Sequence, residues 1–226
     1  PSAPLRKFHI SNVRFDQRLE KAFYDTDLLA KDAVVSLYGD GTLLSGIQRA
    51  FSVGAFGMGG RRKFVPTRWS ITAVDSLLGL HMLETTKTYP FIDEYRVYET
   101  VSLDNRWAVL MMPSSWRYEL IEAWYPKTAW NPHSDRIAII SDHEFFDGRK
   151  TYATIGGCYY AARLAVNELL QKERRQAGVC IMRESHPGYI LPVGVWNVRE
   201  NGRAALRPRP GTFRTLQEAL THVRGV

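Results

Sequence analysis

"YRVYETVSLDNRWAVLMM", residues 95–112, is the stretch that decides the fold class of this chain. Both halves are rich in β-branched and aromatic residues and have a period of two, which is typical of strands. The pair Asp104–Asn105 between the halves favours a tight turn. The stretch therefore predicts a β-hairpin.

The sequence after the hairpin contains further short apolar runs and two helical patterns. The further strands that we expect span residues 118–125, 136–141, 178–185 and 193–200. Residues 154–174 have the period of an amphipathic helix, and residues 212–223 form a last helix. In the first of these helices we expect Arg163, Asn167 and Lys172 to face outward.

The sequence before the hairpin is helical in character. Apolar residues recur at spacings close to 3.6, with a break at residues 25–27 and a stop at Gly39. Pro66 suits the first turn of a third helix. Helices followed by a mostly antiparallel sheet with packed helices indicate an α+β fold. We expect a helical subdomain at residues 1–90 and a sheet subdomain at residues 91–226, joined as one compact unit.

The composition is that of a globular protein with an excess of positive charge. Of 226 residues, 45% are hydrophobic and 23% are charged, and the formal net charge is +7. No apolar run approaches a membrane span and no signal peptide is evident, so we expect a cytoplasmic protein with no membrane partner. The two cysteines cannot form a CxxC metal framework. The charge favours a polyanionic partner.

Two basic clusters are candidates for binding nucleic acid. The first follows a glycine-rich run and has aromatic residues nearby, and prolines stiffen the second. Cations with interleaved aromatic rings are suited to contacts with phosphates and bases. A solvated basic loop without a ligand is the alternative. The candidate contact residues are Arg61, Arg62, Lys63, Trp69, Arg207 and Arg209.

A candidate polar site involves the helix after Pro66 and two strands. Arg68 and Asp75 are seven residues apart, which is two helical turns, so they share one face. Glu99 and Glu122 each interrupt the apolar face of a strand, where an ionised carboxylate needs a partner such as Arg68. The group could be an acid–base site, a metal site or a structural ion-pair network.

Residues 141–157 hold a second concentration of polar groups. Asp142 and Glu144 point the same way if they continue a strand, which would suit a hard cation such as Mg²⁺. Gly156 and Gly157 open a helix that could receive a phosphate, with close helix packing as the alternative. His186, at another strand end, could transfer a proton or serve as a turn residue.

The segment SGIQRAFSVGAFGMGGRRKFVPTRWSITAVD, residues 45–75, closely resembles one that characterises the C-terminal region of the Nre family of archaeal DNA-repair proteins. The match is sharpest at PTRWSITAVD. The resemblance implies a role in repair of damaged DNA, with DNA and other repair proteins as partners. Because the family carries a cysteine-rich N-terminal element, we expect this chain to be the later part of a longer protein. The ending EALTHVRGV lacks the aromatic pair of the family's clamp-binding peptide, so no sliding-clamp peptide is evident.

These observations predict a DNA-repair protein that binds DNA through its basic clusters, around a polar site with Arg68 and Asp75. One alternative is a nuclease or glycosidic-bond hydrolase acting on damaged nucleic acid. Its candidate residues are Asp142, Glu144, Glu99 and His186. A noncatalytic repair adaptor is the other alternative. A cleft that contains three or more of these polar residues favours the enzyme, and their dispersal over the surface favours the adaptor. The most informative observation is whether Arg68, Asp75, Glu99 and Glu122 converge in space.

Overall fold

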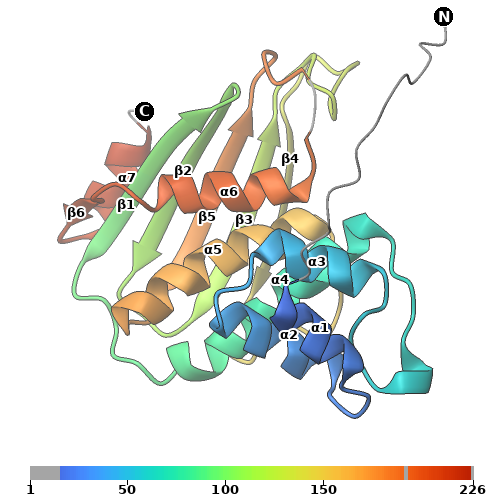
Figure 1. Cartoon of the computed structure of the whole chain (residues 1–226). Helices are drawn as coiled ribbons and strands as arrows, with labels where there is room; N and C mark the ends of the chain where they lie inside the picture. Colours follow the sequence, from blue (N-terminus) through green and yellow to red (C-terminus); the bar gives the residue numbers. More distant parts are fainter. Residues whose placement is uncertain (1–15, 191–192, 225–226) are drawn as a thin grey trace, which may run out of the picture. The chain divides into compact units, whose positions relative to one another are not determined.

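The computed structural model describes residues 16–190 and 193–224, and the chain divides into two compact units, residues 1–65 and 66–226. The first unit is helical (Figure 1). It contains α1 (Gln17–Tyr24), α2 (Ala30–Gly39), α3 (Leu44–Ser52) and the 3-10 turn η1 (Gly59–Arg61). The break expected at residues 25–27 and the stop at Gly39 are confirmed.

The second unit is built on a six-stranded sheet. Its strands are β1 (Tyr95–Ser102), β2 (Asn105–Met112), β3 (Arg117–Trp124), β4 (Ala138–Glu144), β5 (Gly178–Ser185) and β6 (Gly211–Phe213). The strand order is β4-β3-β5-β2-β1-β6, and only the pairing of β3 with β5 is parallel. The expected α+β class is confirmed. The hairpin turn is formed by Leu103 and Asp104, whose φ angles are 50° and 57°, one residue earlier than expected.

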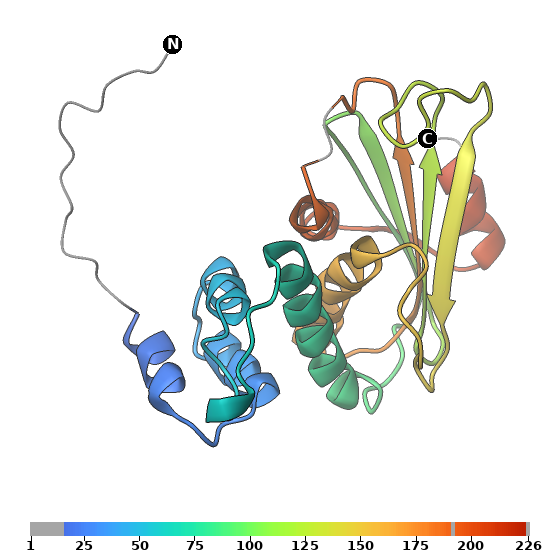
Figure 2. The same ribbon diagram turned by 90° about the vertical axis from the view of Figure 1, so that its right-hand side faces the viewer.

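Helices lie on both faces of this sheet (Figure 2). Helices α5 (Gly157–Glu173) and α6 (Val195–Ala205) lie on one face, and α4 (Thr67–Thr86) packs against α5. Helix α7 (Leu216–Arg224) lies on the opposite face. The main core, which includes Trp107, Tyr118 and Tyr159, forms beneath α5. Helix α4, grouped with the first 90 residues in the sequence analysis, thus packs within the second unit.

Three sequence expectations about these elements were wrong. Residues 212–213, expected to begin the last helix, belong to β6, and α7 begins at Leu216. Residues 195–200, expected as part of a strand at 193–200, instead form the first part of α6, and Gly194, with a φ of +89°, precedes the helix. A short run containing valines does not distinguish a strand from a buried helix. Arg163 and Asn167, expected to face outward, are buried because α4 covers that side of α5. The side-chain amide of Asn167 donates to the carbonyl of Gly79 at 3.0 Å.

Candidate functional site

The four residues whose convergence would favour an enzyme lie in different places. Arg68 is exposed in the first turn of α4, whereas Asp75 on the same helix is fully buried. Glu122 faces α5, beside the main core. Glu99 lies on the opposite face of the sheet, where its Oε2 is 3.1 Å from Nε2 of His222 on α7. The structure does not bring these side chains together in one cleft.

The partner of Asp75 is Arg199 on α6, and the ion-pair network weighed for this helix face is formed there. Nη1 of Arg199 donates to both carboxylate oxygens of Asp75, at 2.7 and 2.8 Å. Burial raises the pKa of Asp75 to about 6, although the nearby charge of Arg199 opposes this shift. The aspartate of the PTRWSITAVD motif therefore joins α4 to α6.

Asp142 and Glu144 share a face of β4 as expected, but they engage different arginines. The guanidinium of Arg149 donates to both oxygens of Asp142, at 2.6 and 2.9 Å, and holds the pKa of that carboxyl well below its usual range. Glu144 is buried and accepts from Arg163 Nη1 at 2.8 Å and from Trp116 Nε1 at 3.0 Å. Within residues 16–190 and 193–224, no cluster of three or more His, Cys, Asp or Glu side chains is placed to hold a metal ion. Both carboxylates serve as ion-pair partners here.

The remaining two candidates have local structural contacts. Nε2 of His186 is 3.2 Å from Oε2 of Glu184, and its ring lies 4.1 Å from that of Tyr125. Gly157 opens α5, but a Cβ atom there would come within 2.6 Å of Thr72 Oγ1. This close approach favours helix packing, the alternative to a phosphate site, as the reason for a glycine at this position.

The basic cluster of the first unit contains one structural arginine and two exposed cations. Nε of Arg62 donates to the carbonyl of Gly57 and its Nη2 donates to the carbonyl of Asp25, each at 2.7 Å. Arg62 therefore holds the loop together. Arg61 and Lys63, on either side of it, are exposed.

Exposed cations also occur in the second unit. Arg207 and Arg209 are exposed after α6, and Trp69 has 62% of its surface exposed next to Arg68. By contrast, the buried arginines of this unit each contact a carboxylate. These buried pairs are Arg163–Glu144, Arg183–Glu122 and Arg199–Asp75.

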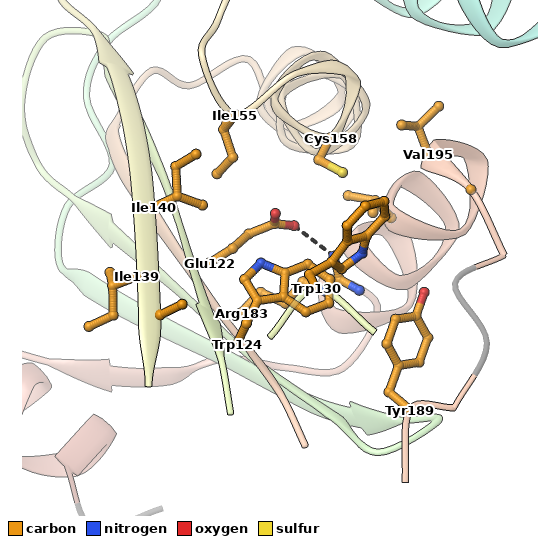
Figure 3. Close-up of a pocket in the computed structure, with 13 residues that line it drawn as sticks. Glu122, Trp124, Trp130, Ile139, Ile140, Ile155, Cys158, Arg183, Tyr189 and Val195 are labelled. Atoms are coloured by element: carbon orange, nitrogen blue, oxygen red, sulfur yellow. Dashed lines mark hydrogen bonds and ion pairs between the residues drawn. The ribbon is translucent and has the colours of Figure 1, made fainter. Parts of the chain in front are cut away.

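A cavity of about 440 Å³ lies in the second unit, where the last residues of β3 and β5 meet the first turns of α5 and α6 (Figure 3). The parallel pairing of β3 and β5 places the C-terminal ends of both strands at this point. Three aromatic side chains, Trp124, Trp130 and Tyr189, line the cavity together with aliphatic residues such as Ile155 and Val195.

A buried ion pair lies in the wall of this cavity. Nη1 of Arg183 donates to Oε1 of Glu122 at 2.6 Å, and the side chains are 3% and 5% exposed. Nε of Arg183 donates to Oδ1 of Asn105 at 3.0 Å, which fixes the plane of the guanidinium. The same guanidinium lies 5.1 Å from the ring of Trp124 and 5.3 Å from that of Tyr189. The cavity therefore combines aromatic faces with one fixed donor and one fixed acceptor.

The cavity has few of the side chains that catalyse bond cleavage. Glu122 is the one carboxylate among its described lining residues, and no histidine is among them. Burial, reinforced by the nearby charge of Glu122, raises the pKa of Cys158 to about 12, so its thiol is neutral near pH 7 and is a poor nucleophile. The arrangement is suited to binding a ligand.

Of the residues that line the cavity, Glu122 was predicted from the sequence as part of a candidate site, whereas most of the others were not. The signal for Arg183 was present, because GVCIMRES alternates like the β3 segment and places Val179, Ile181 and Arg183 on one face. Trp130 and Tyr189 lie in loops between elements, where periodicity gives no information about the direction in which a side chain points.

These features define the class of the protein as an α+β protein with exposed cations and an aromatic cavity. The chain belongs to the archaeal Nre family: residues 1–131 match the family model described as Archaeal Nre, N-terminal, and residues 144–226 match Archaeal Nre, C-terminal. The PTRWSITAVD motif, assigned above to the C-terminal region of the family, lies within the residues that the N-terminal model matches.

Similar curated proteins come from two archaea. The chain is 44% identical to the DNA repair protein NreB of Archaeoglobus fulgidus over 98% of its own length and 56% of that protein. It is 38% identical to the DNA repair protein NreA of the same organism, over 93% of this chain and 53% of that protein. It is 35% identical to NreA of Haloferax volcanii, over 94% and 51%. The chain thus spans about half the length of these relatives. No solved structure shows significant similarity to it.

Proposed function

We propose that this protein acts in DNA repair and binds DNA through exposed cations. The names of its relatives support the repair role. The observation that carries the DNA-binding part is the placement of charge: the buried arginines contact carboxylates, whereas the cations of the two basic clusters, apart from Arg62, are exposed. These exposed cations, in a chain with a formal net charge of +7, are available to a polyanion.

The exposed residues suit contacts that do not depend on base sequence. Lysine and arginine side chains neutralise phosphates and release condensed counterions, which makes the affinity depend on salt. Trp69 offers an exposed ring on which a base can stack. The proposed contact residues are Arg61, Lys63, Arg68, Trp69, Arg207 and Arg209. A protein with this activity would work in the cytoplasm, together with other repair proteins.

The geometry supports binding better than hydrolysis. Asp75, Glu122, Asp142 and Glu144 each contact an arginine, and the four are not gathered around one opening. A hydrolase that uses two carboxylates needs both beside the scissile bond. The noncatalytic alternative therefore fits the described residues better than the nuclease or glycosidic-bond hydrolase.

The salt dependence of DNA affinity tests this proposal, with fluorescence anisotropy of a labelled oligonucleotide as the measurement. The double variant Arg61→Ala/Lys63→Ala should lower the slope of log K against log salt by up to about 1.8, because each lost phosphate contact removes about 0.9. Arg62 is left in place because it holds the loop.

A matched control removes two other exposed cations from the same unit, in the variant Lys21→Ala/Arg49→Ala. We expect its slope to stay close to that of the wild type. If the two double variants behave alike, net charge and not this loop determines the binding. If the wild type shows no salt-dependent affinity for DNA, the proposed function is wrong.

A further inference from the structure

We propose that the aromatic cavity of the second unit binds one nucleobase, and that Glu122 and Arg183 recognise its hydrogen-bonding edge. This inference rests on the proposed role in DNA repair and adds the class of ligand that the cavity binds. It uses a site distinct from the exposed cations, so its binding is measurable even if the surface contacts prove wrong.

The size and walls of the cavity suit a flat ring. A volume of about 440 Å³ is within the usual range for small-molecule sites. Trp130 is 64% exposed and its ring meets that of Trp124 edge-on, with centroids 5.9 Å apart. A planar aromatic ligand could therefore stack on Trp130 while its other end reaches the buried wall between Ile155 and Val195 (Figure 3).

The buried ion pair selects for a ligand that carries donors and acceptors side by side. An ionised carboxylate only accepts hydrogen bonds and a guanidinium only donates them. Among the described residues, Nη2 of Arg183 has no hydrogen-bond acceptor, since the two bonds of this side chain use Nε and Nη1. Unstacked bases are recognised in other proteins through their pairing edge and by aromatic stacking. Among the bases, guanine offers Glu122 two N–H donors, at N1 and N2, next to the O6 carbonyl that Arg183 can reach, whereas adenine and cytosine offer one donor group.

Other ligand classes fit these residues less well. An anion such as phosphate would meet the carboxylate of Glu122 in the wall. An organic cation would meet the positive charge of Arg183, whose guanidinium already lies against the rings of Trp124 and Tyr189. A purely aliphatic ligand would cover the ion pair without offering it a hydrogen bond, and burying polar groups without such partners is costly.

Isothermal titration calorimetry of the whole chain with GMP, AMP, CMP and inorganic phosphate tests the proposal. We expect GMP to bind most tightly and phosphate not to bind. Trp130→Ala should weaken GMP binding by about fivefold or more, the range for loss of one stacking partner. The matched control is Phe91→Ala, which removes a half-exposed ring of the same unit that does not line the cavity and should leave the affinity unchanged.

A second variant tests the role of the carboxylate. Glu122→Gln keeps the shape but turns one acceptor oxygen into a donor, so it should reduce the preference for GMP over AMP by about tenfold or more, as expected when a polar partner is mismatched. Circular dichroism checks that this variant is folded. An unchanged preference in the folded variant would overturn the role of Glu122.

The source of the base is distinguished with a single-stranded oligonucleotide that carries one guanine among abasic positions, at high salt where phosphate contacts are weak. Tighter binding of this strand than of GMP identifies DNA as the source, and tighter binding of GMP identifies a free nucleotide. If neither binds, or if Trp130→Ala binds both like the wild type, the nucleobase site is wrong. The variant Arg61→Ala/Lys63→Ala should keep GMP affinity, which separates this result from the test of surface DNA binding.

Discussion

Replacing Arg199 by methionine should destabilise the protein, and the loss should depend on pH. The variant removes both hydrogen bonds from Arg199 to Asp75, at 2.7 and 2.8 Å, while the carboxylate stays fully buried. Breaking a buried ion pair from one side costs about 3–5 kcal/mol of unfolding free energy. We expect a loss in this range above neutral pH.

The pH dependence follows from the raised pKa of Asp75. Burial raises this pKa from 3.8 to about 6 in the folded protein, so the folded state binds the proton more tightly than the unfolded state. The stabilisation from this proton is complete below about pH 4 and is lost as the pH rises through 6, a difference of roughly 3 kcal/mol. Without the opposing charge of Arg199 the pKa of Asp75 rises further. The deficit of Arg199→Met should therefore shrink between pH 8 and pH 5.

Urea unfolding of the wild type and the variant at about pH 5 and pH 8 measures both effects. Arg68→Met is the matched control, because Arg68 is an exposed arginine on the same helix as Asp75 and should change the free energy of unfolding by less than about 0.5 kcal/mol. The double variant Asp75→Asn/Arg199→Met should recover part of the loss at pH 8. A loss below about 1 kcal/mol at pH 8, or an equal loss at both pH values, would refute the reasoning.

Two further predictions concern Gly157 at the start of α5 and the carboxylate of Asp142 on β4. Gly157→Ala should lower the free energy of unfolding by about 1–3 kcal/mol, since the new methyl group meets Thr72 Oγ1 at 2.6 Å and Val195 Cγ1 at 2.8 Å; thermal unfolding measures this. Asp142→Asn should make the free energy of unfolding less dependent on pH in the acid range. The guanidinium of Arg149 holds the pKa of Asp142 below its usual range, so the ion pair stabilises the fold above about pH 4. This stabilisation is lost as the pH falls and the carboxylate takes up a proton. An acid titration followed by circular dichroism measures the second effect.

The controls for these two variants lie at open positions. Gly60→Ala adds a methyl group where no atom lies within 4 Å, so a similar loss there would show that the effect of Gly157→Ala is not steric. Asp147→Asn removes an exposed carboxylate near β4. If it flattens the acid dependence as much as Asp142→Asn does, the effect is general charge and not the pair with Arg149.

The elements set by local signals could be predicted from the sequence. The β1–β2 hairpin depends on alternation and a turn within eighteen residues, both of which are visible in residues 95–112. The start of α6 could not, because VGVWNVRE fits a strand as well as a helix and tertiary packing decides between them. The burial of Arg163 also depends on another element, since α4 covers the side of α5 that a single-helix pattern assigns to solvent.

For the candidate site, single residues could be predicted from the sequence, but the residues with which they pair could not. Glu122 was recognised as a carboxylate that needs a partner, and Asp75 as a member of a polar site or an ion-pair network; both contact an arginine. Arg68 was the partner expected for Glu122, but it lies exposed on α4. The actual arginines, Arg183 and Arg199, lie 61 and 124 residues further along the chain, at distances where no local pattern specifies a pairing.

The position of β5 in the sheet has a consequence for synthesis of the chain. β5 pairs with β2 on one side and with β3 on the other, although both are made earlier. A nascent chain that has reached α5 therefore carries two separate ribbons, β1–β2 and β3–β4, with unpaired backbone edges that invite aggregation. Only after Ser185 has left the ribosome can these ribbons join, by a non-local and hence slow step. A chain that stops before β5 leaves two unjoined ribbons in place of a smaller domain.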